Sequence, residues 1–330
     1  MMSKKDFDKK KIVFVFLNSG EKISFSNDNL IVKDKNDNIK LQATCYRVWA
    51  LLIVGSFTIT TGLIQRSHKF GFPIFLLTYS LKLYDRLGSY MEGNVVLRKK
   101  QYSYEGLRIG TAIITNKVSN QLALLKERRN KSQSLKDDID KLESYLLGLK
   151  GFSGSLQELL GVEGNVAKIY FKHQFDNVDW RGRKPRVKGD FVNSSLDIGY
   201  SILFNVIEAL LSLFGFDTFK GVLHTEFYMR KSLVCDIMEP FRVLIDNQIR
   251  KVINLRQLQV DDFTLVNHAY QLSWNSNKKV VALFLQAILE RKSEIFSYIQ
   301  NYYRFVMRNK DIKEFPEFNW SKKENDNSLL

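Results

Sequence analysis

A histidine and two acidic residues in the second half of the chain have the types and spacing of metal ligands. His224 follows the apolar turn GVLH and precedes a predicted helix that carries Asp236 and Glu239. Residues three positions apart share one face of a helix, and the apolar flanks SLVCD and IMEPF indicate that this face is buried. A buried carboxylate must be paired, protonated or bound to a metal ion. Carboxylates with one imidazole suit Mg²⁺ or Mn²⁺, and the nitrogen favours Mn²⁺.

Two interpretations of these acids stay open at this point. An ion pair with Arg230 or Arg242 would satisfy the same buried carboxylates without any metal. A further acid, Glu163, lies in LLGVEGNVAKIYF between Gly161 and Gly164, and small residues would let a backbone or a phosphate come close. A single glutamate in a helix is otherwise most often a surface residue.

A second candidate site is the basic segment WRGRKPRVKG. Its glycines and proline predict a loop rather than a helix, and Trp180 offers an aromatic face. Cationic and aromatic side chains on a loop suit phosphate backbones and unpaired bases, although a solvated loop without a ligand would look the same. The predicted DNA-binding residues are Arg181, Arg183, Lys184, Arg186 and Lys188.

Composition bounds the remaining possibilities. The 330 residues carry 50 Lys and Arg against 35 Asp and Glu, a net charge of +15 that favours a polyanionic partner. The common nucleotide and zinc signatures GxxxxGK[ST], GxGxxG, HExxH and paired CxxC do not occur in the sequence. Cys45 and Cys235 are isolated, so we expect core packing and a reducing compartment, the cytoplasm.

The first ninety residues predict β structure. Short apolar runs alternate with turn-prone Asn, Asp, Ser and Gly. Residues 48–65 form the longest uncharged run, but it is shorter than the ~20 residues of a membrane span. We therefore expect a strand, a turn and a short helix ending at Gly71. The predicted strands are 12–17, 22–26, 30–34, 39–43, 51–54, 73–77 and 81–85.

Helical periodicity begins after about residue 94. Apolar residues recur at helical spacing over 104–129, and a last long helix is predicted from about 278 to 307. We expect an α+β protein in which a small β-rich domain (1–92) and a linker (93–102) precede a larger all-α domain (103–330). The polar segment from 310 to 330 is expected to be a loose tail.

Several segments together resemble a known family. ALLIVGSFTITTGLI, GFPIFLLTY, NVVLRKKQY, LGVEGNVAKIYF, GVLH and SLVCDIMEPFRVLID follow one another as in the catalytic integrase subunit of CRISPR spacer acquisition, a metal-dependent DNA endonuclease. The resemblance covers nearly the whole chain. It implies that Glu163, His224 and Glu239 are the catalytic metal ligands and that Asp236 supports them. Glu239 stands where some members have Asp.

The resemblance also implies an activity and partners. The expected reaction is attack of a DNA 3′-hydroxyl on a repeat phosphodiester, with Mg²⁺ or Mn²⁺, on double-stranded and branched DNA. The β-rich domain would form a homodimer, and a small ferredoxin-like CRISPR partner would join the complex. The competing hypotheses are a non-catalytic DNA-binding dimeric scaffold and a membrane-surface protein. Since Lys126–Lys150 mixes both charge signs, we expect no membrane partner.

Overall fold

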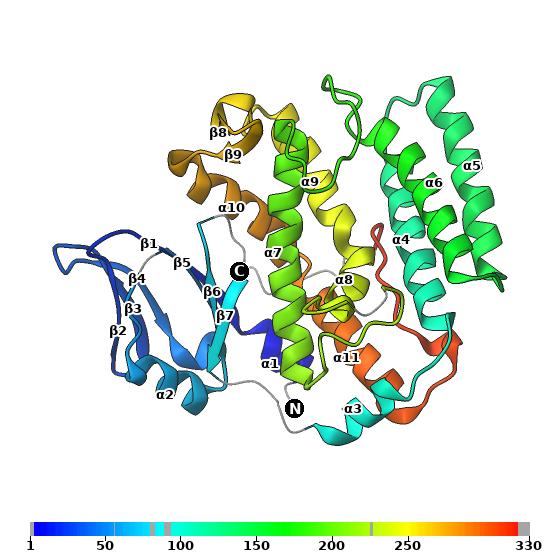
Figure 1. Cartoon of the computed structure of the whole chain (residues 1–330). Helices are drawn as coiled ribbons and strands as arrows, with labels where there is room; N and C mark the ends of the chain where they lie inside the picture. The colour runs from blue at the N-terminus through cyan, green and yellow to red at the C-terminus, as the bar shows by residue number, and fades with distance from the viewer. Residues whose placement is uncertain (1–2, 56, 80–82, 89–93, 225–226, 323–330) are drawn as a thin grey trace. The chain divides into compact units, whose positions relative to one another are not determined.

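The computed structural model describes residues 3–322, except 56, 80–82, 89–93 and 225–226 (Figure 1). The chain divides into two compact units, residues 1–94 with 209–215, and residues 95–208 with 216–330. The predicted domain boundary at residue 92 lies outside the described residues. The prediction of a β-rich region followed by a helical domain is confirmed.

The first unit contains two sheets, and each strand overlaps a predicted one. The last strand, predicted at 81–85, is seen at Leu83–Gly88, and residues 81 and 82 lie outside the described part of the chain. Short α1 (Lys4–Asp8) precedes them, and the turn η1 (Cys45–Arg47) leads into β5. A mixed sheet has the order β1-β5-β6-β7, formed by β1 (Lys11–Leu17), β5 (Val48–Gly55), β6 (Pro73–Leu77) and β7 (Leu83–Gly88). An antiparallel sheet is formed by β2 (Lys22–Ser26), β3 (Asn29–Lys33) and β4 (Ile39–Thr44).

The longest uncharged run contains a strand and the start of a helix, as expected; the predicted turn between them includes residue 56, which lies outside the described residues. All residues of β5 except Gly55 are buried, because parallel neighbours β1 and β6 flank it on both sides. Helix α2 (Thr61–Phe70) then crosses over to β6 and ends at Gly71, whose φ of 70° is left-handed. Gly55 is required for another reason: a Cβ there would lie 2.3 Å from the Leu17 carbonyl oxygen.

Helix α4 is central to the second unit. It packs against α5, α6, α8 and α9, and Figure 1 shows α4, α5 and α6 side by side. The helices are α3 (Val95–Tyr102), α4 (Arg108–Lys126), α5 (Gln133–Lys150), α6 (Leu156–Gln174), α7 (Phe191–Phe214), α8 (Ser232–Met238), α9 (Arg242–Asn254), α10 (Trp274–Leu289) and α11 (Lys292–Arg308), with 3₁₀ turns η2 (Glu239–Phe241), η3 (Val260–Asp262) and η4 (Ile312–Glu314). The expected linker is helical from Val95.

The structure differs from the predicted helical pattern in two places. A hairpin of β8 (Phe263–Val266) and β9 (Ala269–Leu272) makes the second domain mostly rather than entirely helical. Its turn residues Asn267 and His268 both have positive φ. Two-residue hairpin turns need this conformation, which glycine usually supplies; here the turn-prone Asn267 is present but no glycine. The predicted long last helix is two helices that meet at Glu290 and Arg291.

The prediction of a loose tail is wrong for residues 310–322. Phe315 and Phe318 are buried, and the buried Arg291 guanidinium donates to the carbonyls of Asn319, Trp320 and Lys322. These backbone contacts cannot be read from a polar sequence. Residues 323–330 lie outside the described part of the chain.

Helix α7 is the one described helix that is long and apolar enough to cross a membrane. However, 78% of its most apolar window is buried within the protein. Burial of this kind is typical of the core helix of a globular protein.

The tail contact on α4 predicts a stability effect. Asn116 donates from Nδ2 to the Phe318 carbonyl (2.7 Å) and accepts from the Phe318 N–H (3.0 Å). We expect Asn116→Ala to lower the free energy of unfolding by about 2–4 kcal/mol, because two buried backbone groups lose their partners. Urea unfolding measures this, and exposed Asn130→Ala should change it by less than about 0.5 kcal/mol. Equal effects of the two substitutions would contradict the docked tail.

Candidate active site

Two of the predicted acidic ligands converge on one cationic atom. Glu163 lies on α6 and Glu239 begins the turn η2, and both carboxylates contact Nζ of Lys117 on α4. The Nζ distance to Glu239 Oε2 is 2.7 Å. The other oxygen of Glu239 lies 2.9 Å from the Arg242 guanidinium. These four side chains, called here the charge cluster, come from three segments of the chain, α4, α6 and the region of η2 and α9.

Mutual attraction holds Glu239 and Lys117 ionised within the charge cluster. Burial raises the pKa of the Glu239 carboxyl, but Arg242 and Lys117 outweigh burial and hold this pKa at about 2. Burial likewise lowers the pKa of Lys117, and the two glutamates more than reverse the effect. The sequence left two interpretations of these acids open, a metal site or an ion pair, and the structure contains the ion pair with Arg242. It brings Glu163 into the same cluster.

The predicted supporting acid orients His224. Asp236 on α8 is fully buried and accepts the backbone N–H groups of Val222, Leu223 and His224 at 2.7–3.1 Å. His224 Nδ1 lies 2.5 Å from Asp236 Oδ1. Because a carboxylate accepts, Nδ1 carries a proton, and Nε2 is the ring nitrogen that offers a lone pair in the neutral tautomer. This is the arrangement in which a carboxylate prepares an imidazole to bind a metal ion.

The donor chemistry fits a divalent cation in part. Glu163 and Glu239 already share one positive charge, the ammonium of Lys117, and His224 is close enough to help lower the pKa of Glu239. Within the described residues, however, no three His, Cys, Asp or Glu side chains are arranged to hold a metal ion. The structure thus brings the two acids together around a cation, and orients His224 separately through Asp236.

Lys117 was missed by the sequence analysis, although a signal was present. It is the only charged residue between Arg108 and Lys126, within the apolar pattern of a buried helix. A lone lysine at such a position requires an acidic partner. Another histidine, His173, contacts Asp138 at 2.8 Å.

A second buried network adjoins the charge cluster. Asp246 on α9 accepts hydrogen bonds from Tyr170 (3.0 Å) and Tyr200 (2.5 Å). Arg242 lies over the Tyr200 ring, 4.5 Å from its centroid, and Arg183 lies over it at 5.6 Å. The cation–π contact holds Arg242, and therefore Glu239, in place.

The five predicted DNA-binding residues separate into two groups. Arg181, Lys184 and Arg186 are exposed. Arg183 is largely buried and pairs with Asp197 at 2.6 Å, so it anchors the loop to α7. The Lys188 carbonyl accepts the Tyr270 N–H, which fastens the end of the loop to β9.

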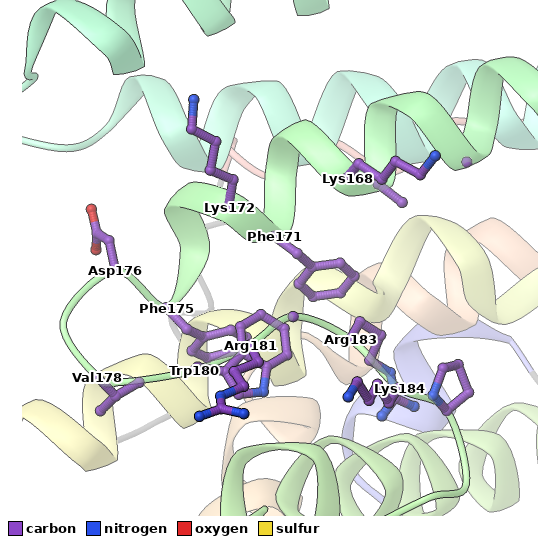
Figure 2. A pocket seen from close by; sticks show the side chains of 14 residues that line it. Lys168, Phe171, Lys172, Phe175, Asp176, Val178, Trp180, Arg181, Arg183 and Lys184 are labelled. Carbon is purple, nitrogen blue, oxygen red and sulfur yellow. The ribbon is translucent and has the colours of Figure 1, made fainter.

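A groove of about 700 Å³ separates this loop from α6. Figure 2 shows Phe171 pointing from α6 toward Trp180 and Arg181 of the loop. Trp180 packs edge-on against Phe171 (5.7 Å) and Phe175 (5.0 Å). Lys168 and Lys184 also line the groove, and so does Gly164, the residue after Glu163 on α6. The groove therefore combines an aromatic floor with a cationic rim on the same helix that carries Glu163.

Comparison with known proteins decides the family. The family model "CRISPR associated protein Cas1" matches residues 14–286. The chain belongs to the Cas1 family. A curated relative, "CRISPR-associated endonuclease Cas1 1" of Archaeoglobus fulgidus, is 27% identical over 300 residues, covering 82% of this chain and 86% of the relative.

Two solved structures share the Cas1 fold seen here. "Casposase bound to integration product" has a TM-score of 0.75 and 20% identity, covering 95% of this chain and 96% of that one. "Cas6-RT-Cas1--Cas2 complex" has a TM-score of 0.76 and 20% identity, covering 94% of this chain but 36% of that one. At these identities the likeness establishes the fold alone.

The Asp246 network predicts a pH dependence of stability. Burial raises the Asp246 pKa to about 6, although Tyr200, Tyr170, Arg242 and Arg183 lower it. A folded-state pKa above the unfolded value favours folding at low pH, and the advantage is lost as pH rises from about 4 to about 6. We expect the stability of wild type relative to Asp246→Asn to fall by up to about 3 kcal/mol over this range. Urea unfolding at each pH measures the difference, and a constant difference would contradict the assignment.

Proposed function

We propose that this chain is a divalent-metal-dependent DNA endonuclease and integrase that inserts new spacers into a CRISPR array. The observation that carries the proposal is the convergence of Glu163 and Glu239, from distant segments, on a single cationic nitrogen. The imidazole of His224, oriented by Asp236, would supply a third donor when the ion is bound. Membership of the Cas1 family supports the reaction class, since curated relatives are named endonucleases.

The proposed step is an in-line transesterification. A DNA 3′-hydroxyl attacks a repeat phosphodiester; a new P–O bond forms, and the target strand leaves with its own 3′-hydroxyl. Bound Mg²⁺ or Mn²⁺ would stabilise charge on the phosphate oxygens. Glu163, Glu239 and His224 Nε2 would hold that ion, and Asp236 keeps the imidazole in the required tautomer. Arg242 fixes the second oxygen of Glu239.

DNA binding is assigned to the exposed side of the basic loop and to the groove. Arg181, Lys184 and Arg186 are free of the buried contacts that hold Arg183, so they suit phosphate oxygens. The groove is lined by α6, the helix that carries Glu163, so DNA bound there would lie along the helix that supplies one of the acids. The substrates proposed are double-stranded and branched DNA.

The proposed assembly follows the family. The β-rich first unit would form a homodimer, and a small ferredoxin-like CRISPR partner would join it. A solved neighbour is a Cas1–Cas2 complex and another is bound to an integration product, which supports both DNA and a protein partner.

Substitution of the three ligands tests the chemistry. We expect Glu163→Gln, His224→Ala and Glu239→Gln each to reduce strand transfer into a repeat duplex by at least about 100-fold. Asp236→Asn should cost about 10–100-fold, the effect typical of a residue that orients a ligand. The assay is gel analysis of a labelled branched product with Mn²⁺ or Mg²⁺.

Glu143→Gln, a surface acid paired with Lys126, is the matched control and should retain the wild-type rate. The ion pairs of the charge cluster also favour a second candidate, a non-catalytic DNA-binding scaffold. Wild-type protein that binds branched DNA but gives no strand transfer with any divalent ion would establish that second function.

The basic loop makes a separate prediction. We expect the triple substitution of Arg181, Lys184 and Arg186 by alanine to weaken duplex DNA binding about tenfold or more at 0.1 M salt. The slope of log K against log salt should fall by up to about 3, close to one per lost phosphate contact. Fluorescence anisotropy at several salt concentrations measures both quantities.

Two controls interpret that result. Arg183→Ala should mainly destabilise the protein, because Asp197 loses its partner. A second triple variant removes three charges from another exposed surface and should leave the slope nearly unchanged; it replaces Arg129, Lys136 and Lys150. Equal slopes for the two triple variants would show that overall charge, and not this loop, binds DNA.

A further inference from the structure

Lys117 occupies the position where the two acidic ligands meet. Its side chain is 8% exposed, and its Nζ contacts both Glu163 and Glu239. A buried ammonium is costly unless it is paired, and here both partners are the residues proposed to hold the divalent ion. The lysine and that ion therefore compete for the same oxygens.

The charges of the cluster disfavour holding both cations at once. The two formal negative charges of Glu163 and Glu239 are already balanced by Lys117 and Arg242. A divalent ion would add two positive charges beside the buried Lys117 and Glu239, while the Glu163 side chain is 27% exposed. Arg242 is held over the Tyr200 ring, whereas Lys117 reaches the acids on a flexible chain of methylenes. Lys117 is thus the cation that can leave.

We propose that Lys117 is an internal counter-ion that holds the two glutamates together in the metal-free protein and is displaced when the divalent cation binds. The inference rests on the proposed metal site. It assigns Lys117 a positioning role: the lysine prevents repulsion between the acids before metal arrives and lowers the affinity for the metal. Removal of the ammonium should therefore lower the stability of the metal-free protein and raise its affinity for the metal ion.

The test measures Mn²⁺ alone, without DNA and without an activity assay. We expect Lys117→Met to lower the melting temperature in EDTA by several degrees, and to bind Mn²⁺ at least tenfold more tightly than wild type by calorimetry. Saturating Mn²⁺ should restore most of the lost melting temperature. Lys117→Gln, which keeps a hydrogen-bond donor without the charge, should show the same directions if the methionine variant does not fold.

Matched variants separate the possible failures. Lys126→Met, at the exposed end of the same helix, should leave the Mn²⁺ affinity unchanged. Glu163→Gln should abolish Mn²⁺ binding; if wild type and Glu163→Gln bind equally, the proposed metal site fails and the Lys117 role fails with it. If Glu163→Gln abolishes binding but both Lys117 variants bind Mn²⁺ no more tightly than wild type, the counter-ion role alone is overturned.

Discussion

The burial of opposite charges around Glu239 is the constraint on which the helical unit depends. A carboxylate that is 4% exposed must be compensated, and the compensation comes from Lys117 of α4 and Arg242 of α9. Glu163 of α6 joins through the same ammonium. Three helices are thus fixed at one point by charge as well as by apolar packing, so the elements that would bind a metal ion also hold the unit together.

Most of the local structure could be predicted from the sequence. All seven predicted strands exist, because alternating apolar residues and turn residues are local signals. The break before Lys292 and the docked tail could not, since both depend on contacts distant in sequence. The hairpin is local, but its turn residues Asn267 and His268 include no glycine. Arg291 illustrates the limit: its partners are backbone carbonyls, which every sequence contains.

The site was likewise predictable from the sequence only in part. Asp236 and Glu239 were expected on one helical face, but α8 ends at Met238 and the two acids serve different partners. Asp236 holds a loop and an imidazole, and Glu239 holds two cations. The role of Lys117 required a third helix to be placed beside them. The segment with five closely spaced basic residues was correctly predicted to be a loop. Only the structure shows that Arg183 holds the loop in place through Asp197, whereas its neighbours Arg181 and Lys184 are exposed.

The docked tail ties the order of synthesis to the assembly of the site. Asn120 accepts the Trp320 N–H and donates to the carbonyl of Pro240, the residue after Glu239. Asn116, one position before Lys117, is fastened to Phe318. A nascent chain on the ribosome has neither contact until residues 318–320 have been translated, which is 202 residues after Asn116 and 200 after Asn120. The supports of the charge cluster therefore form only after the helices that they hold have been synthesised.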